Sequence, residues 1–321
     1  MPLLVRGSRR SNAPRPHRSS HEKTFLSVFS SRDLAAVVFS FQHGLYQDMM
    51  SFMHLPRSTD CEFSKLLMAN VNAVLAPWLD THGTSRLSTL FDVLPDVGRL
   101  VVMHAVMTGR MDVLAYVDRW YSLKAFDIDL LDLAAWSNQL DVLKFLHSIE
   151  HSGCSRFAMD TASAHGYLAI VEFLHANRTE GCSNDAMDRA AENGHLNVVQ
   201  FLHTHRPEGC STNAMEMAAW RGHVDIVRYL HENRNEGCTS MAMQKAAASG
   251  HVAVIDFLHH NRREGCLRRA LEVPSKSSVR RYLLETLKNH GCHCSKCEGR
   301  RHYHFLDVLS SMVWVVLSGR L

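Results

Sequence analysis

Residues 147–266 repeat themselves at a fixed interval of 28 positions. Four residue types keep this interval in parallel columns. The columns are Cys154, Cys182, Cys210, Cys238 and Cys266; Gly166, Gly194, Gly222 and Gly250; Met159, Met187, Met215 and Met243; and His147, His175, His203, His231 and His259. A period in this range is typical of stacked supersecondary units, none of which buries its apolar face alone. We therefore expect a repeat array, stabilised by contacts between neighbouring units.

The unit from Ser183 to Cys210 predicts a pair of short helices. Ser183 offers an N-cap side chain, and residues 186–193 favour a first helix. Gly194 ends that helix, because glycine adopts the left-handed conformation without strain. A second helix is expected over residues 195–206. The remaining connection is too short for a pair of strands, so the sequence predicts an all-α fold.

These helix pairs resemble the ankyrin repeat in the strings AAENGHLNVVQFL (190–202), AAWRGHVDIVRYL (218–230) and AAASGHVAVIDFL (246–258). The usual ankyrin unit has 33 residues and a T-P-L-H opening. Here the unit is five residues shorter, and Ala-Met-Asp or Ala-Met-Glu stands in place of Pro-Leu-His. The resemblance covers roughly residues 101–291. It implies an α-solenoid of about seven short helix-turn-helix repeats, with Asn138 standing in the glycine column.

Three further regions flank the repeats. Residues 1–23 have the composition of a disordered basic tail. Residues 24–100 show a helical apolar pattern without the 28-residue step, and we expect them to form a helical cap on the first repeat. The stretch 34–41 also suggests an F-box-like adaptor module. Residues 292–321 form a tail that contains cysteine and histidine.

Charge, hydropathy and cysteine usage restrict the function. The net charge of +3 arises because residues 1–23 and 279–301 carry +5 and +4, which leaves −6 for the rest. An acidic body is a poor surface for nucleic acid, which requires a basic stripe. No apolar run reaches the 18 or so residues of a membrane span. Packed helices hold the cysteine column too far apart for disulfides, so we expect reduced thiols. Reduced thiols indicate a cytoplasmic protein, and a nuclear location is the alternative. We also expect a monomer.

Catalytic motifs are absent from the sequence. It contains no Gly-rich phosphate loop, no H-E-x-x-H and no G-x-S-x-G, so we predict neither an enzyme nor a cofactor. The histidine column is expected to pack rather than to bind metal, because neighbouring units cannot share one ion. The C-terminal region offers one weak candidate for a metal site, and the alternative is a flexible tail without metal. Its candidate ligands are Cys292, Cys294, Cys297, His302 and His304.

The positions before each turn vary while the repeat frame stays constant. The ankyrin resemblance implies that these positions contact partners on the concave face, and variation in a rigid frame suits recognition. The predicted partner-binding residues are Trp136, Ser137, His165, Arg189, Glu192, Asn193, Met217, Trp220, Arg221 and Lys245. The sequence thus predicts a protein–protein interaction scaffold. The alternative is an adaptor that joins a target to a second complex through a ubiquitin-type or zinc-dependent terminal region.

Overall fold

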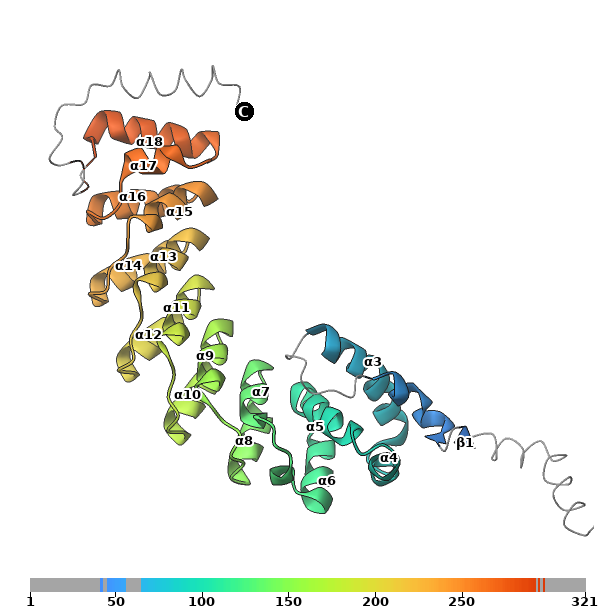
Figure 1. Cartoon of the computed structure of the whole chain (residues 1–321). Coiled ribbons are helices and arrows are strands. Elements are labelled where there is room, and N and C mark those ends of the chain that lie inside the picture. The colour runs from blue at the N-terminus through green and yellow to red at the C-terminus, as the bar shows by residue number, and fades with distance from the viewer. Residues whose placement is uncertain (1–40, 43–44, 56–64, 293, 295–296, 298–321) are drawn as a thin grey trace, which may run out of the picture. The chain divides into compact units, whose positions relative to one another are not determined.

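The computed structural model describes residues 41–42, 45–55, 65–292, 294 and 297. The chain divides into two compact units, Met1–Val101 and Val102–Leu321, and helices form nearly all of the described secondary structure (Figure 1). The predicted all-α solenoid is therefore confirmed. The only described strands form one short antiparallel pair. No described helix is both long and apolar enough to cross a bilayer.

The first unit is a small helical cluster. Its elements are β1 (Phe41–Gln42), β2 (Leu45–Tyr46), the 3-10 helix η1 (Gln47–His54), α3 (Lys65–His82), α4 (Leu87–Val93) and the start of α5 (Val97–Thr108). Phe52 of η1 is buried and meets Trp78 of α3 edge to face, with ring centroids 5.4 Å apart. Leu75, Leu87 and Leu90 are also fully buried in this unit. Whether residues 24–100 cap the repeats stays a prediction.

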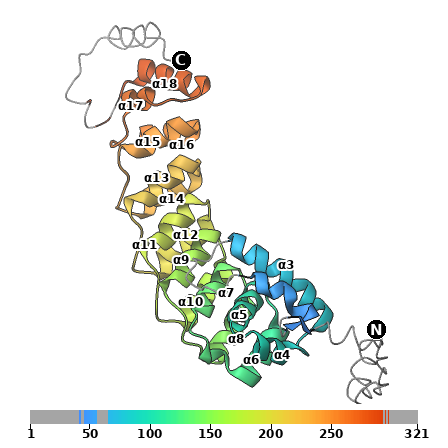
Figure 2. The same ribbon diagram turned by 45° about the vertical axis from the view of Figure 1, so that its right-hand side comes forward.

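The second unit is a row of helix pairs. After the end of α5 come α6 (Met111–Tyr121), the 3-10 helix η2 (Leu123–Ala125), α7 (Leu130–Trp136), α8 (Leu140–Ser148), α9 (Arg156–His165), α10 (Leu168–Asn177), α11 (Asn184–Glu192), α12 (Leu196–His205), α13 (Thr212–Arg221), α14 (Val224–Asn233), α15 (Met241–Ser249), α16 (Val252–Asn261), α17 (Leu267–Glu272) and α18 (Ser277–His290). Figures 1 and 2 both show these pairs stacked in chain order from α7 to α18.

Small side chains bring the first helices of successive pairs together. Ala186 and Ala190 of α11 are fully buried, as are Ala218 and Ala219 of α13. The odd-numbered helices α7 to α15 each pack closely on the next, whereas the second helices of neighbouring pairs touch less. Because the first helices approach more closely, they line the inner side of this row.

The turn column adopts the backbone conformation predicted for it. Gly194 has φ +88°, and Asn138, which replaces glycine in the same column, has φ +60°. A second constraint acts at Gly194, because a Cβ there would lie 2.8 Å from Cε1 of His223 in the next unit. The turn glycine therefore serves both the left-handed turn and the close approach of the neighbouring unit.

The histidine column has the predicted packing role. The first four of its five rings each meet an aromatic ring of the next unit edge to face, with centroid distances of 5.5 to 5.8 Å. The pairs are His147–Phe173, His175–Phe201, His203–Tyr229 and His231–Phe257. Such edge-on contacts favour a fixed geometry between units.

Candidate functional site

One face of the first helices carries most of the variable side chains. On α13, Asn213, Met217 and Trp220 stand at positions i, i+4 and i+7, which share one side of a helix. The equivalent residues are Phe157, Thr161 and Ala164 on α9, Asp185, Arg189 and Glu192 on α11, and Met241, Lys245 and Ala248 on α15. We call this set of residues, from α9 to α15, the first-helix face.

Three predicted residues form a cluster across two units of this face. The side chain of Trp220 is exposed, with 38% of its surface accessible. The Arg221 guanidinium lies 4.2 Å from the centroid of the Trp220 ring, in a cation–π contact. Arg221 Nη2 also lies 2.9 Å from Glu192 Oε1 on α11. The cluster therefore presents an indole, a cation and an anion side by side.

Other predicted residues bind within the array. Asn193 Nδ2 donates to the carbonyl oxygen of Ala164 at 2.7 Å, one unit earlier. Lys245 Nζ lies 3.4 Å from Oε2 of the buried Glu216. Asn193 and Lys245 consequently help to join neighbouring units. Arg189 is exposed and pairs at 3.3 Å with Asp185, one turn before it.

The remaining predicted residues do not join the cluster. Trp136 ends α7 and is half-buried, and α9 and α11 separate it from α13. The Ser137 hydroxyl donates to a carbonyl one turn earlier at 2.7 Å. His165 is exposed and stacks on Tyr167, with centroids 5.4 Å apart. Met217 is half-buried on the first-helix face.

Sequence reasoning missed the first column of this face. Phe157 is 56% exposed and Met241 is 45% exposed, both near the start of a first helix. They occupy the same column, three 28-residue steps apart. That column also varies along the chain, and this variation was the signal that could have identified it. The most exposed described tryptophan, Trp120 at 64%, lies in the last turn of α6, outside the face.

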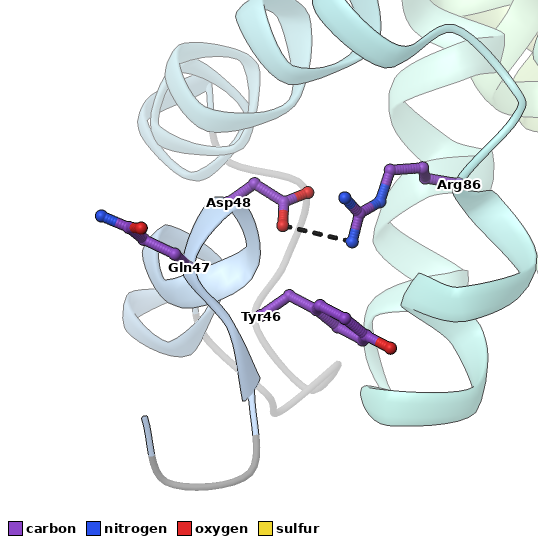
Figure 3. A pocket seen from close by; sticks show the side chains of 4 residues that line it. All are labelled: Tyr46, Gln47, Asp48 and Arg86. Carbon is purple, nitrogen blue, oxygen red and sulfur yellow. Dashed lines mark ion pairs between the residues drawn. The ribbon is translucent and has the colours of Figure 1, made fainter. Parts of the chain in front are cut away.

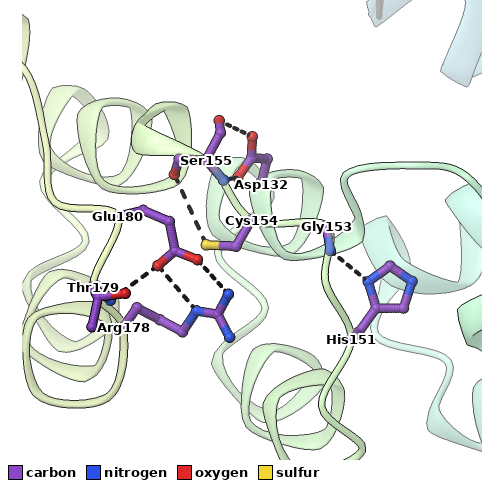
Figure 4. A network of polar contacts seen from close by, with 8 residues as sticks. All are labelled: Asp132, His151, Gly153, Cys154, Ser155, Arg178, Thr179 and Glu180. Atoms are coloured by element: carbon purple, nitrogen blue, oxygen red, sulfur yellow. Dashed lines mark hydrogen bonds and ion pairs between the residues drawn. The ribbon is translucent and has the colours of Figure 1, made fainter.

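A carboxylate from each of α7, α9, α11 and α13 holds the start of the next unit. Asp132 accepts hydrogen bonds from the backbone N–H of Ser155 at 2.8 Å and from its hydroxyl (Figure 4). Burial raises the pKa of Asp132, and the bonds from Ser155 oppose that shift. The same connection recurs as Asp160–Ser183, Asp188–Ser211 and Glu216–Thr239. These residues fill the Ala-Met-Asp and Ala-Met-Glu positions, so that departure from the usual repeat has a structural role.

The loop cysteines are unreactive in this setting. Burial raises the pKa of Cys154 to about 12 and that of Cys182 to about 11. Burial likewise raises the pKa of Cys210 and Cys238 to about 11. Since the thiolate is the nucleophilic form, these thiols are poor nucleophiles at neutral pH.

The Arg–Glu pairs of the loops are largely enclosed on the arginine side. Arg178 pairs with Glu180 beside Cys154, and the Arg178 side chain is only 19% exposed (Figure 4). The equivalent pairs are Arg206–Glu208, Arg234–Glu236 and Arg262–Glu264, whose arginine side chains are 16–20% exposed. The guanidinium groups of Arg206, Arg234 and Arg262 lie against Gly181, Gly209 and Gly237 of the preceding loop, so these pairs contribute packing as well as charge.

A surface hollow in the first unit has no catalytic arrangement. Tyr46, Gln47, Asp48 and Arg86 line it (Figure 3). Arg86 Nη2 lies 3.3 Å from Asp48 Oδ1, and its guanidinium lies 4.9 Å from the centroid of the Tyr46 ring. Trp78 Nε1 donates to the other oxygen of Asp48 at 3.0 Å. Because both carboxylate oxygens are engaged, Asp48 tethers η1 to α3 and to Arg86.

The structure adds one cysteine, Cys266, to the candidate metal ligands near the C-terminal end. Cys292, Cys294 and Cys297 lie against Cys266, the last member of the 28-residue column. His302 and His304 lie outside the described residues. The sequence assigned Cys266 to the loop column and did not include it among the candidate ligands.

Comparison with known families identifies similarity over the central pairs. Residues 189–269 match a family model described as ankyrin repeats in three copies, and residues 155–203 match one described as ankyrin repeats in many copies. These matches run from α9 to α17. No curated protein matches the chain.

Proposed function

The chain is an ankyrin repeat protein whose matched repeats span residues 155–269, and we propose that it binds a partner protein through the first-helix face. Ankyrin repeats are protein–protein interaction modules, and members of this family are typically scaffolds rather than enzymes. Because a fold alone does not fix a function, the proposal depends on the surface itself.

The observation that carries the proposal is the cluster of Trp220, Arg221 and Glu192. Tryptophan and arginine are the residues most often found at the energetic centres of interfaces. Ala164 and Ala248 occupy the Trp220 column in other units, so the frame does not require an indole there. Phe157 and Met241 add exposed apolar area at the other end of the same helix face. This combination supports a partner segment with apolar anchors and charges of both signs.

The test is a quantitative binding comparison of matched tryptophan variants. Partners would be captured with the intact chain, and a partner whose capture depends on Trp136 and Trp220 together would then be purified. Trp220→Ala is expected to weaken that partner's binding by about 1–3 kcal/mol. In calorimetry this corresponds to a roughly 5- to 150-fold rise in Kd.

Trp120→Ala is the matched control, because Trp120 is more exposed than Trp220 and lies on α6, outside the face. It should leave Kd unchanged. Thermal unfolding of Trp220→Ala should resemble that of the wild type. An equal loss of affinity in both variants would contradict the proposal, and a large fall in Tm of Trp220→Ala would mean that the indole stabilises the array.

A further inference from the structure

We propose that Cys266, Cys292, Cys294 and Cys297 form a tetrahedral zinc site that closes the C-terminal end of the repeat array. All four sulfur atoms lie within 4.8 Å of one another. Cys266 and Cys294 are buried, and Cys292 and Cys297 are half-buried. Zinc is the divalent ion most often held by four cysteines in a structural site.

The separations between the sulfurs fit one tetrahedral ion. Zinc–sulfur bonds of about 2.3 Å place the corners of an ideal tetrahedron about 3.8 Å apart. Here the Sγ atoms of Cys266 and Cys297 are 3.8 Å apart, and those of Cys266 and Cys292 are 3.9 Å apart. Cys292 and Cys294 have sulfurs 3.5 Å apart. A disulfide requires a separation of about 2.0 Å, so these contacts match shared metal coordination better than a covalent pair.

Backbone groups around the sulfurs supply donors suited to thiolates. The N–H groups of Leu267 and Cys294 lie near the sulfur of Cys292, and the N–H of Arg269 lies near that of Cys266. Donors in such positions would orient the ligands and offset the charge of a zinc–thiolate centre. Cys297 N–H also donates to Cys294 O at 2.9 Å, a turn that holds these two ligands near each other.

The site would give Cys266 a role that its column partners lack. In earlier units the loop cysteine lies beside an arginine of the following loop, as Cys238 does beside Arg262. After Cys266 the next loop supplies Cys292 and its neighbours instead. Coordination would fasten the end of α18 to the start of α17, which are the last two described helices. Metal binding would thus stabilise the last described helix pair.

The experiment measures metal in the purified full-length chain and compares two cysteines of the same column. Elemental analysis should find about one zinc per chain in the wild type. Cys266→Ala should lower zinc affinity at least about 100-fold, because the loss of outer partners alone costs 10- to 100-fold. Cys238→Ala, one unit earlier, should retain full zinc content.

Cobalt provides a second measurement that does not depend on the variants. Titration of metal-free wild type with Co²⁺ should give sulfur-to-cobalt charge-transfer bands and the intense visible bands of tetrahedral coordination, and Zn²⁺ should remove both. Chelation should also accelerate hydrogen exchange in residues 277–290, while residues 184–192 stay protected.

Several outcomes would overturn the assignment. These are zinc content well below one ion per chain after reconstitution, cobalt spectra without thiolate bands, or equal zinc loss in Cys238→Ala and Cys266→Ala. Iron as the resident metal, or a disulfide between any two of the four cysteines in protein purified under reducing conditions, would also refute it.

Discussion

The bond between Asp188 and Ser211 offers a sharp test of how neighbouring units are joined. Asp188 on α11 is 8% exposed and accepts from the backbone N–H of Ser211 at 2.8 Å and from its hydroxyl at 2.5 Å. Ser211 is also the N-cap of α13, where its hydroxyl accepts from Asn213 N–H. Asp188→Ala therefore removes two acceptors from the residue that starts the next helix.

The expected cost follows from these contacts. Hydrogen bonds to a charged group each contribute about 1.5–3 kcal/mol. Burial, which raises the pKa of Asp188, offsets part of that gain. Ser211 is half-buried, so water can replace some of the lost contact. We expect Asp188→Ala to reduce the free energy of unfolding by about 2–3 kcal/mol and Asp188→Asn by about 1 kcal/mol.

Urea unfolding followed by circular dichroism measures the change, and hydrogen exchange locates it. Exchange should accelerate first in residues 205–216, because each unit contacts only its neighbours. Asp185→Ala is the control: its side chain is 60% exposed and pairs with Arg189 on the surface, so the cost should stay below about 1 kcal/mol.

A double-mutant cycle tests whether Asp188 and Ser211 act together. If the two side chains act together, Asp188→Ala and Ser211→Ala should cost less in combination than the sum of the single changes, by about 1 kcal/mol or more. Additive losses, or an Asp188→Ala variant as stable as Asp185→Ala, would show that this carboxylate does not join the units.

Two other predictions concern the same frame. Gly194→Ala should destabilise the chain by about 1–3 kcal/mol in urea unfolding, because it combines left-handed strain with a contact at His223. Gly83 also has a positive φ, but a Cβ there meets nothing within 4 Å. An equal loss of stability in Gly83→Ala would therefore show that the contact with His223 contributes nothing. Hydrogen bonds from Arg234 lower the pKa of Glu236 from 4.5, so its stabilising effect is present above that value and lost as pH falls through the lowered pKa. Glu236→Gln should therefore lose less Tm than wild type between ~pH 6 and ~pH 2, and parallel Tm curves would contradict this.

The sequence predicted the repeat frame closely because the frame depends on local rules. Gly194 and Asn138 mark turns through their own backbone preferences, and the structure gives both a positive φ. The partner of Asp188 could not be predicted in the same way, since Ser211 lies 23 residues later and the repeat assigns the same spacing to many pairs. The contacts of Cys266 could not be predicted either. Its place in the 28-residue column suggested an ordinary loop residue, whereas its contacts depend on how the shortened last unit folds.

The first-helix face also contains both residues whose contacts stay within one unit and residues that contact a neighbouring unit. Variation along the first-helix face indicates which side chains are free to differ, but it does not show which of them also hold the array together. Asn193 and Lys245 vary between units and yet bind the preceding unit, so their substitution would change stability and binding at once. Trp220 differs from both, because its ring is exposed and its contact with Arg221 lies within one helix. Trp220 is therefore a position where a loss of binding can be interpreted without a change in the frame.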